Sequence, residues 1–287
     1  MSVSVVKGID ILRPYVYSVN EKQGETMTMK YCHYELLVAI STFESQIETL
    51  IQYSAESCDC FTLLQDKLDE LCAWILDESA QNLSDQLGHN PEHDRQLKKL
   101  RETAIKALCL LEKHQSECAQ SHALNVSEYL SQLSNNVYVE LDHAGVMPSS
   151  RVLFIGSGSY PLSAFTIAQL TGAAVHGIDI DEQAVTMANR LDSTSLMTTF
   201  GCRDLVTEFN DFKPTHVVVA SLVEHKWEVL HQLKPLLTPS HRVLVRFGNG
   251  LKSAFNYPFN PTLMEGWDSH HVSNAAAVYD TVVMGRI

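Results

Sequence analysis

The 287-residue sequence has no long run of hydrophobic residues. A helix that crosses a bilayer needs about 20 consecutive apolar residues, and no segment approaches that length. The first ten residues also lack the basic and then apolar order of a secretion signal. We therefore expect a cytoplasmic protein that has no membrane partner.

Positive charge is scarce. Lys and Arg number 21 against 34 Asp and Glu, which gives a formal net charge of −13. Proteins that bind DNA or RNA neutralise backbone phosphates with Lys and Arg, and no basic run is present to do this. The charge balance therefore argues against nucleic acid as the partner.

Paired cysteines at metal-binding spacing are missing as well. The seven cysteines are dispersed, and an odd, scattered set without a secretion signal indicates free thiols in a reducing compartment. His89 and His93 are four residues apart, but a loop containing Gly, Asn and Pro interrupts the helical spacing that would put both rings on one face. We expect no bound metal.

The chain divides into two parts with different hydrophobic periodicity. In the first part apolar residues recur at three- and four-residue steps, as in helices with one buried stripe. Three such stripes and a shorter fourth cover residues 36–51, 61–76, 97–111 and 124–133. Pro91 is suited to open the third helix. The first part is therefore predicted to be an all-helical domain, residues 1–147.

After Pro148 short valine-rich segments alternate with helical ones. This alternation indicates a parallel sheet covered by helices on both faces. The clearest expected strands are residues 151–155, 174–178, 216–220 and 242–247. The whole chain is thus predicted to be α/β, with a Rossmann-like domain over residues 148–287 that follows the helical one.

A glycine turn follows the first expected strand. Gly156, Ser157 and Gly158 end that strand, and a helix begins near Pro161. Glycines at this place let the backbone approach a ligand. The pattern lacks the third glycine that dinucleotide-binding domains use for close helix–strand packing. S-adenosylmethionine has no pyrophosphate for a helix N-terminus to hold, so the turn favours that cofactor over a nicotinamide one.

Acidic and small residues follow the other expected strands. Asp179 ends the second strand, where a carboxylate accepts hydrogen bonds from ribose hydroxyls. Asp181 is expected to cap the next helix. Asp204 is expected to accept from the adenine amino group, and Ala220 and Leu222 end the fourth strand. Since carboxyl ends of parallel strands meet at one edge, these residues predict a cofactor site. The alternative is that the acids are only helix caps.

Several longer segments resemble one family. They are FIGSGSYPLS, HGIDIDEQAVTMANRL, VVVASLVEHKWEVLHQL and HRVLVRFGNGLKSAFNYPF, with LLEKHQSE and NNVYVEL upstream of the first strand. Together they make residues 112–287 similar to the nicotianamine synthase family. The similarity is strongest to its bacterial opine-metallophore branch, which consists of histidine 2-aminobutanoyltransferases.

The resemblance implies a reaction. An enzyme of this branch moves the 3-amino-3-carboxypropyl (aminobutanoyl) group of S-adenosylmethionine to the amine of histidine, and methylthioadenosine leaves. No metal is required for this step. The amine must first lose a proton, so a base is needed. Carried over, Glu112 is that base and Tyr138 orients the amine or relays its proton. The resemblance also allows a homodimer through the helical domain.

The acceptor is expected to lie near three residues of the fifth strand and its loop. These are Arg246, Phe247 and Asn249. Phe247 and Asn249 replace smaller or imidazole side chains of the plant members of the family, and Arg246 precedes them. For Arg246 two roles stay open: its guanidinium binds a carboxylate of the substrate or cofactor, or it pairs with an acid on a neighbouring strand.

Two other functions remain open on the sequence. One is an ordinary small-molecule methyltransferase that uses the same cofactor. The other is a non-catalytic cofactor-binding module with a degenerate Rossmann domain. The adenosine product separates the three: methylthioadenosine indicates aminobutanoyl transfer, S-adenosylhomocysteine indicates methylation, and no product indicates the binding module.

Overall fold

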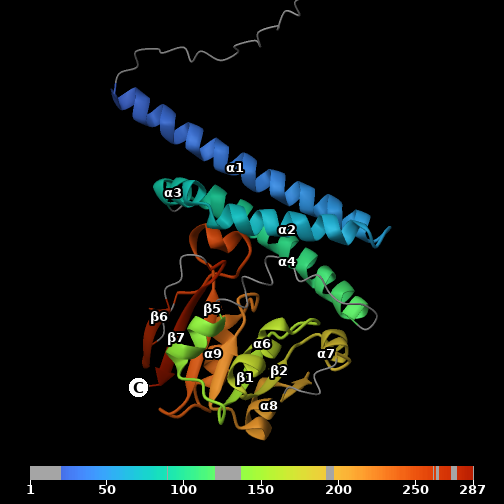
Figure 1. Cartoon of the computed structure of the whole chain (residues 1–287). Coiled ribbons are helices and arrows are strands. Elements are labelled where there is room, and N and C mark those ends of the chain that lie inside the picture. Colours follow the sequence, from blue (N-terminus) through green and yellow to red (C-terminus); the bar gives the residue numbers. More distant parts are fainter. Residues whose placement is uncertain are drawn as a thin grey trace, which may run out of the picture.

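The computed structural model describes residues 21–88, 90–119, 137–191, 197–260, 262, 265–272 and 277–286. Figure 1 shows two parts, a group of long helices at one end of the molecule and a mixed sheet flanked by helices below it. Within the described residues, none of the helices combines the length and hydrophobicity that crossing a membrane requires.

Four helices make up the first part. They are α1 (Glu21–Ser54), α2 (Cys60–Leu76), α3 (Glu78–Leu87) and α4 (Pro91–Ala119). The three long stripes predicted as helices are confirmed in α1, α2 and α4, and Pro91 opens the last of them. The expected helix over 124–133 lies outside the described residues.

Helix α3 is not expected from the sequence. Its residues are mostly polar, and Ala80 is its fully buried residue. Its start is nevertheless marked by Asp77, whose side chain accepts a hydrogen bond from the Ala80 amide at 2.9 Å. A capped helix with a narrow apolar face thus occupies a segment whose composition suggests a loop.

The second part is a seven-stranded sheet in the order β3-β2-β1-β4-β5-β7-β6. The strands are β1 (Arg151–Ile155), β2 (Ala174–Ile178), β3 (Thr198–Gly201), β4 (His216–Val219), β5 (Arg242–Phe247), β6 (Trp267–Val272) and β7 (Asp280–Arg286). The first five run parallel, as predicted. The antiparallel pair β6 and β7 extends the sheet beyond β5 and is not anticipated by the sequence analysis.

Helices cover both faces of this sheet, which confirms the α/β fold. They are α6 (Leu162–Thr171), α7 (Glu182–Ala188), α8 (Leu205–Phe212) and α9 (Lys226–Leu233), together with the helical segment 137–144. One face packs on α6 and 137–144, and the other packs on α8 and α9. Because successive side chains of a strand point to opposite faces, each strand contributes to both cores.

The helical part sits on the carboxyl edge of the parallel strands. Its core includes residues of the second part, which come from the 3-10 helix η1 (Gly250–Ala254) after β5 and from the segment before β7. These core residues are Leu251, Ala254, Phe255, Val278 and Tyr279. The helical part therefore covers the edge at which such sheets bind ligands.

Candidate functional site

The turn after β1 is tightly packed. Gly156 and Gly158 have φ values of +84° and +70°, which favour glycine. A Cβ on Gly156 would lie 2.8 Å from the Val223 side chain, and a Cβ on Gly158 would lie 2.6 Å from Glu112 Oε2. The amides of Gly156 and Ser157 donate to Ile178 O at 2.8 and 3.1 Å. The turn therefore holds its shape and leaves no room for a side chain at either glycine.

Asp179 is fixed against this turn. Its Oδ2 accepts from the Gly158 amide at 2.8 Å, and its Oδ1 accepts from the Asp181 amide at 3.0 Å. Each carboxylate oxygen keeps a further lone pair for a ligand hydroxyl. The Ser157 hydroxyl is buried and has no partner in the described part of the chain. Two acceptors and an unpaired hydroxyl beside a bare backbone turn suit the ribose of an adenosine group.

Glu112 reaches the same turn from the helical part. It lies on α4 and is partly buried, with its carboxylate against Gly158. Burial raises the pKa of Glu112 to about 8, the charge of Asp179 adds to this rise, and a backbone hydrogen bond from Ser159 opposes it. The site thus holds a carboxyl group that binds a proton near neutral pH.

Two further residues of α4, Ser116 and Lys113, hold the helix in place beside Glu112. The Ser116 hydroxyl donates to Ser159 O at 2.6 Å. Lys113 Nζ lies 3.0 Å from Asp181 Oδ2 and 3.2 Å from Gln183 Oε1, at the start of α7. Asp181 also accepts from the Gln183 amide, so it caps α7 as predicted. These contacts link the helical part to two turns of the carboxyl edge.

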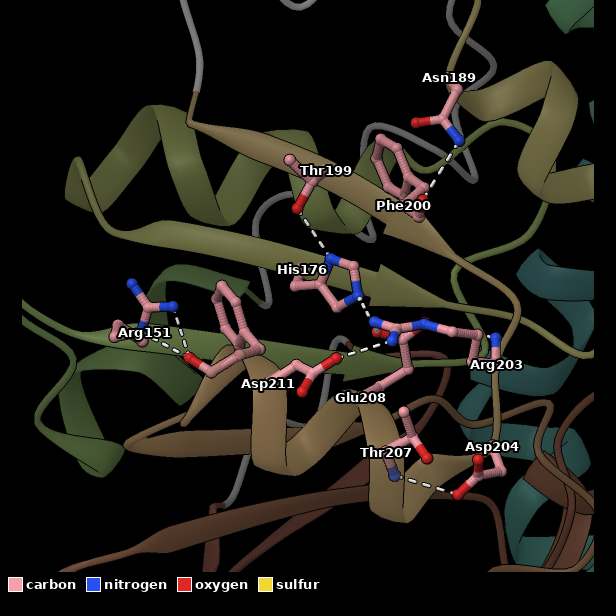
Figure 2. Close-up of polar contacts among 11 residues, drawn as sticks. Arg151, His176, Asn189, Thr199, Phe200, Arg203, Asp204, Thr207, Glu208 and Asp211 are labelled. Atoms are coloured by element: carbon pink, nitrogen blue, oxygen red, sulfur yellow. Dashed lines mark hydrogen bonds and ion pairs between the residues drawn. The ribbon is translucent and has the colours of Figure 1, made fainter.

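Asp204 lies at the start of α8 and is exposed. Its Oδ1 accepts from the Thr207 amide at 3.0 Å, as a helix cap does, and hydrogen bonds with Thr207 lower the pKa of Asp204. Figure 2 shows the network beside it, in which buried Glu208 bonds to Arg203 and His176. The capping role is observed, whereas contact with an adenine amino group stays a prediction.

Ala220 and Leu222 stand where the sequence places them, just after β4. The Ala220 amide donates to Ile155 O at 3.0 Å, and its Cβ would lie 3.3 Å from a Cβ on Gly156. Leu222 packs against the core of the helical part. Both residues therefore adjoin the carboxyl edge, one on the glycine turn and one on the helices that cover it.

The Tyr138 side chain is exposed. Its exposed fraction is 66%, on the helical segment 137–144. Among the described residues, no hydrogen bond or ring contact joins it to Glu112. Of the two residues expected to catalyse the reaction, Glu112 lies at the turn, and the role of Tyr138 stays a prediction.

Arg246 is buried and paired with an acid. Its Nε and Nη2 lie 3.0 and 2.8 Å from Glu140 Oε2, and its Nη1 donates to Ser163 Oγ at 3.0 Å. Thr281 Oγ1 donates to the other oxygen of Glu140 at 2.6 Å. Of the two roles open for Arg246, the structure shows the pairing, with an acid on the segment 137–144 and not on a neighbouring strand. A role of Arg246 in binding substrate stays a prediction.

Phe247 and Asn249 are also held by the protein itself. The Phe247 ring lies in the core against Phe259 and His271, because alternation along β5 turns it away from the face of Arg246. The Asn249 amide donates to Phe259 O at 2.9 Å, and its oxygen accepts from Phe259 N at 3.1 Å. Both side chains therefore have partners within the protein, and contact of either with a substrate stays a prediction.

Glu140 is a buried charged residue that is not expected from the sequence. Its partner Arg246 is 106 residues away, so no local motif contains the pair. One signal is present: Glu140 shares a helical face with Val137, Leu141 and Ala144, which are all buried. An acid on an apolar face predicts a buried partner, although it cannot say which one.

No group of three or more His, Cys, Asp or Glu side chains in the described ranges is arranged to hold a metal ion. All seven cysteines lie among the described residues, and none of them forms a disulfide there.

Comparison with known proteins agrees with this architecture. A family model described as nicotianamine synthase protein matches residues 35–287. The L-histidine 2-aminobutanoyltransferase of Pseudomonas aeruginosa (strain UCBPP-PA14) is 32% identical over 262 residues, which are 88% of this chain and 97% of that one. The enzyme of the same name from Yersinia pestis is 29% identical, over 87% and 95% of the two chains.

Solved structures share the fold. A mutant of MtNAS in complex with S-adenosylmethionine superposes with a TM-score of 0.74 at 15% identity, over 87% of this chain and 97% of that one. MtNAS in complex with MTA and tNA gives 0.73 at 16% identity, with the same coverage. The helical part over a Rossmann-like sheet is thus common to both proteins. With a family model that matches most of its length and relatives that align nearly end to end, this chain belongs to the nicotianamine synthase family.

Proposed function

We propose that this protein transfers the 3-amino-3-carboxypropyl group of S-adenosylmethionine to the α-amine of L-histidine. The observation that carries the proposal is the state of Glu112. Its carboxyl group lies against the glycine turn and has a pKa of about 8. The curated relatives named L-histidine 2-aminobutanoyltransferase, which align over 87–88% of this chain, support the choice of acceptor. The product is then the histidine-derived intermediate of an opine metallophore.

The residues at the carboxyl edge fit the cofactor. Asp179 and the Ser157 hydroxyl would hold the ribose, and the bare backbone at Gly156 and Gly158 would lie along the nucleoside. Asp204 would add an acceptor for the adenine amino group. S-adenosylmethionine, when bound, supplies an electrophilic methylene carbon next to a sulfonium that leaves as methylthioadenosine.

Glu112 takes the proton. An amino-acid amine is mostly protonated near neutral pH and must lose a proton before its lone pair can form the new C–N bond. A carboxylate in water is too weak a base for this, but one whose pKa lies near 8 is matched to the task. As the C–N bond forms, the C–S bond breaks and its electron pair stays on sulfur, so charge and atoms balance.

The position of Glu112 also determines which carbon reacts. A methyltransferase and an aminobutanoyltransferase use the same sulfonium and differ in the carbon that the nucleophile approaches. Because Glu112 comes from α4, the acceptor amine is held on the side of the helical part. The helical part over the edge would keep water from the site and fix that approach.

We propose that the reaction needs no metal ion, because a sulfonium is already a good leaving group and a carboxylate can accept the amine proton. Activity after dialysis against a chelator is expected to equal that of the untreated enzyme. A loss of activity that one divalent metal restores would contradict this.

The test is an incubation of the purified protein with S-adenosylmethionine and either L- or D-histidine, followed by mass spectrometry. We expect methylthioadenosine and a histidine that carries one aminobutanoyl group, with L-histidine as the consumed enantiomer. S-adenosylhomocysteine would instead show an ordinary methyltransferase. The absence of any adenosine product, with S-adenosylmethionine still bound, would show a non-catalytic binding module. A reaction without histidine controls for spontaneous breakdown of the sulfonium.

A further inference from the structure

Two buried cations share one aromatic ring at the junction between the helical part and the sheet. Arg101 of α4 is 7% exposed and Lys226 of α9 is 1% exposed. The guanidinium carbon of Arg101 lies 5.0 Å from the centre of the Tyr257 ring, and Lys226 Nζ lies 5.6 Å from the same centre. Two positive charges are thus held close together by a ring that attracts both.

Neither cation is neutralised by an ion pair in the described part of the chain. Arg101 Nη1 donates to Ser253 O at 2.8 Å, and Lys226 Nζ donates to Ser221 O and Val223 O at 2.9 and 2.6 Å. These acceptors are all backbone carbonyls. The buried Nε of Arg101 has no partner. Buried charges in proteins are normally paired, so this cluster has an excess of positive charge.

The acids around the cluster stand at its rim. Glu224 is half-exposed and its Oε2 lies 3.5 Å from Tyr257 Oη, while Glu102 follows Arg101 on α4. Both act on Arg101 through their charge only. Burial and then the charge of Arg101 lower the pKa of Lys226 to about 7. The environment therefore favours either loss of the lysine proton or arrival of an anion.

The cluster borders the proposed site. Lys226 is bonded to the loop after β4, and Val223 of that loop packs on Gly156 of the turn. The Tyr257 amide donates to Ser221 O at 3.1 Å, which ties the same loop to the segment after η1. Arg101 precedes Glu112 by eleven residues of α4, about three turns and about 16 Å, so both side chains project from one face of the helix.

We propose that Arg101 and Lys226, on either side of Tyr257, bind an α-carboxylate of the reacting amino acids. The inference rests on the proposed function, because both ligands of that reaction carry such a group: the acceptor amino acid and the aminocarboxypropyl arm of the cofactor. A guanidinium and an ammonium both donate to carboxylates, and the unpaired Arg101 Nε provides a donor for it.

Binding by calorimetry with matched ligands tests this. L-histidine is compared with histamine, which lacks only the carboxylate, in the presence of methylthioadenosine. S-adenosylmethionine is compared with methylthioadenosine, which lacks the whole arm. We expect Arg101→Gln to weaken binding of the carboxylate-bearing member of one pair about 10- to 100-fold and to leave its counterpart within about twofold. The pair that responds identifies which carboxylate is bound.

Lys226→Met should weaken binding of the same carboxylate-bearing ligand as Arg101→Gln does. Lys106→Gln, an exposed cation on the same helix, is the matched control and should change neither pair. For each pair the measured quantity is the ratio of the dissociation constants of its two ligands. If both ratios stay unchanged in both variants, the carboxylate site is overturned, whether or not the enzyme is active. Absence of methylthioadenosine release by the wild type would overturn the proposed function while leaving the binding comparison valid.

A second measurement avoids substitutions in the cluster, in case Lys226→Met does not fold. A carboxylate beside Lys226 raises the pKa of that lysine, so binding near pH 7.5 should take up a proton. The uptake is measured from the dependence of the binding enthalpy on the buffer, in Glu112→Gln protein so that Glu112 does not titrate. Proton uptake with the carboxylate ligand and none with its counterpart is expected. Equal uptake for both ligands would contradict the proposal.

Discussion

At the scale of the residue, the role of Glu112 depends on a raised pKa and on a position against the glycine turn. Glu112→Gln keeps the shape of the side chain and removes the base. We expect kcat to fall by about 10²- to 10⁴-fold, the usual contribution of a positioned base. Methylthioadenosine should bind within about threefold of the wild type, measured by calorimetry. A variant that keeps most of its activity would show that another group accepts the proton.

The same pKa makes Glu112 a source of pH-dependent instability. Its folded pKa of about 8 lies above its ordinary value of 4.5, so between these values the folded protein binds more protons than the unfolded chain. The contribution of Glu112 to the unfolding free energy therefore falls as pH rises from 4.5 to about 8, and it levels off above pH 8. Over the same pH range the unfolding free energy of Glu112→Gln should rise relative to that of the wild type, by about 1–3 kcal/mol once partial exposure is allowed for. Urea unfolding of both proteins at several pH values measures this, and parallel curves would contradict it.

At the scale of the element, the turn after β1 requires glycine for two reasons that can be separated. Gly158 and Gly145 both have positive φ values, +70° and +68°, and Gly145 has open space where Gly158 faces Glu112. Alanine at either position carries a similar backbone cost of about 1–2 kcal/mol. Only Gly158→Ala should also displace Glu112 and weaken nucleoside binding, by about tenfold or more in calorimetry. Equal losses of binding would show that backbone strain alone matters.

The helical segment 137–144 is held to the sheet by the pair Glu140–Arg246. Glu140→Ala leaves the buried guanidinium without its acid and should cost about 3–5 kcal/mol of unfolding free energy. Replacing both partners, as Glu140→Leu with Arg246→Met, removes the charge altogether and should recover much of that loss. Urea denaturation of the two variants measures the difference. A double variant that is less stable than Glu140→Ala would show that the pair contributes net stability.

The elements predicted from the sequence are those with strong local patterns. The strands β1, β2 and β5 are found at their expected bounds because each is a short, mostly apolar segment that is followed by a turn. Strand β6 escapes prediction because it is an edge strand with four exposed residues and no apolar alternation. Helix α3 escapes because its face toward the core is narrow.

The residues of the site also divide into those that a local sequence pattern predicts and those that it does not. The glycine turn, Asp179 and the cap at Asp181 follow from local sequence. The partners of Arg246 and of Lys226 do not, because they come from elements far along the chain. The role of Glu112 needed the family resemblance, since a lone acid on a helix carries no local signal of a raised pKa.

At the scale of the whole molecule, the helical part cannot complete its core alone. Phe255 and Tyr279, which belong to the second part, are buried in the core of α1, α2 and α4. The proposed boundary at residues 147 and 148 therefore passes between two parts that share one core. Since Glu112 and Arg101 come from one side of it and the glycine turn and Lys226 from the other, the proposed site exists only while the two parts stay docked.

This shared core predicts that the chain unfolds in one cooperative transition. The three tryptophans offer the probe, because Trp74 lies on α2 while Trp227 and Trp267 belong to the second part. Unfolding is followed by fluorescence in one variant that keeps only Trp74 and in another that lacks only Trp74, with far-ultraviolet circular dichroism in both. Within each variant the fluorescence and dichroism midpoints should coincide.

Phe255→Ala should lower the unfolding free energy in both reporter backgrounds by the same amount, about 3–5 kcal/mol, since it removes a ring from the core that the two parts share. Phe259→Ala, which removes a ring from the core on the α9 face of the sheet, is the matched substitution. If the two parts unfold together, Phe259→Ala should also shift the unfolding midpoints of both reporter variants by the same amount. If instead the Trp74 signal moves with Phe255→Ala and stays fixed with Phe259→Ala, the parts unfold separately, and opening of the helices from the sheet becomes the route by which ligands enter.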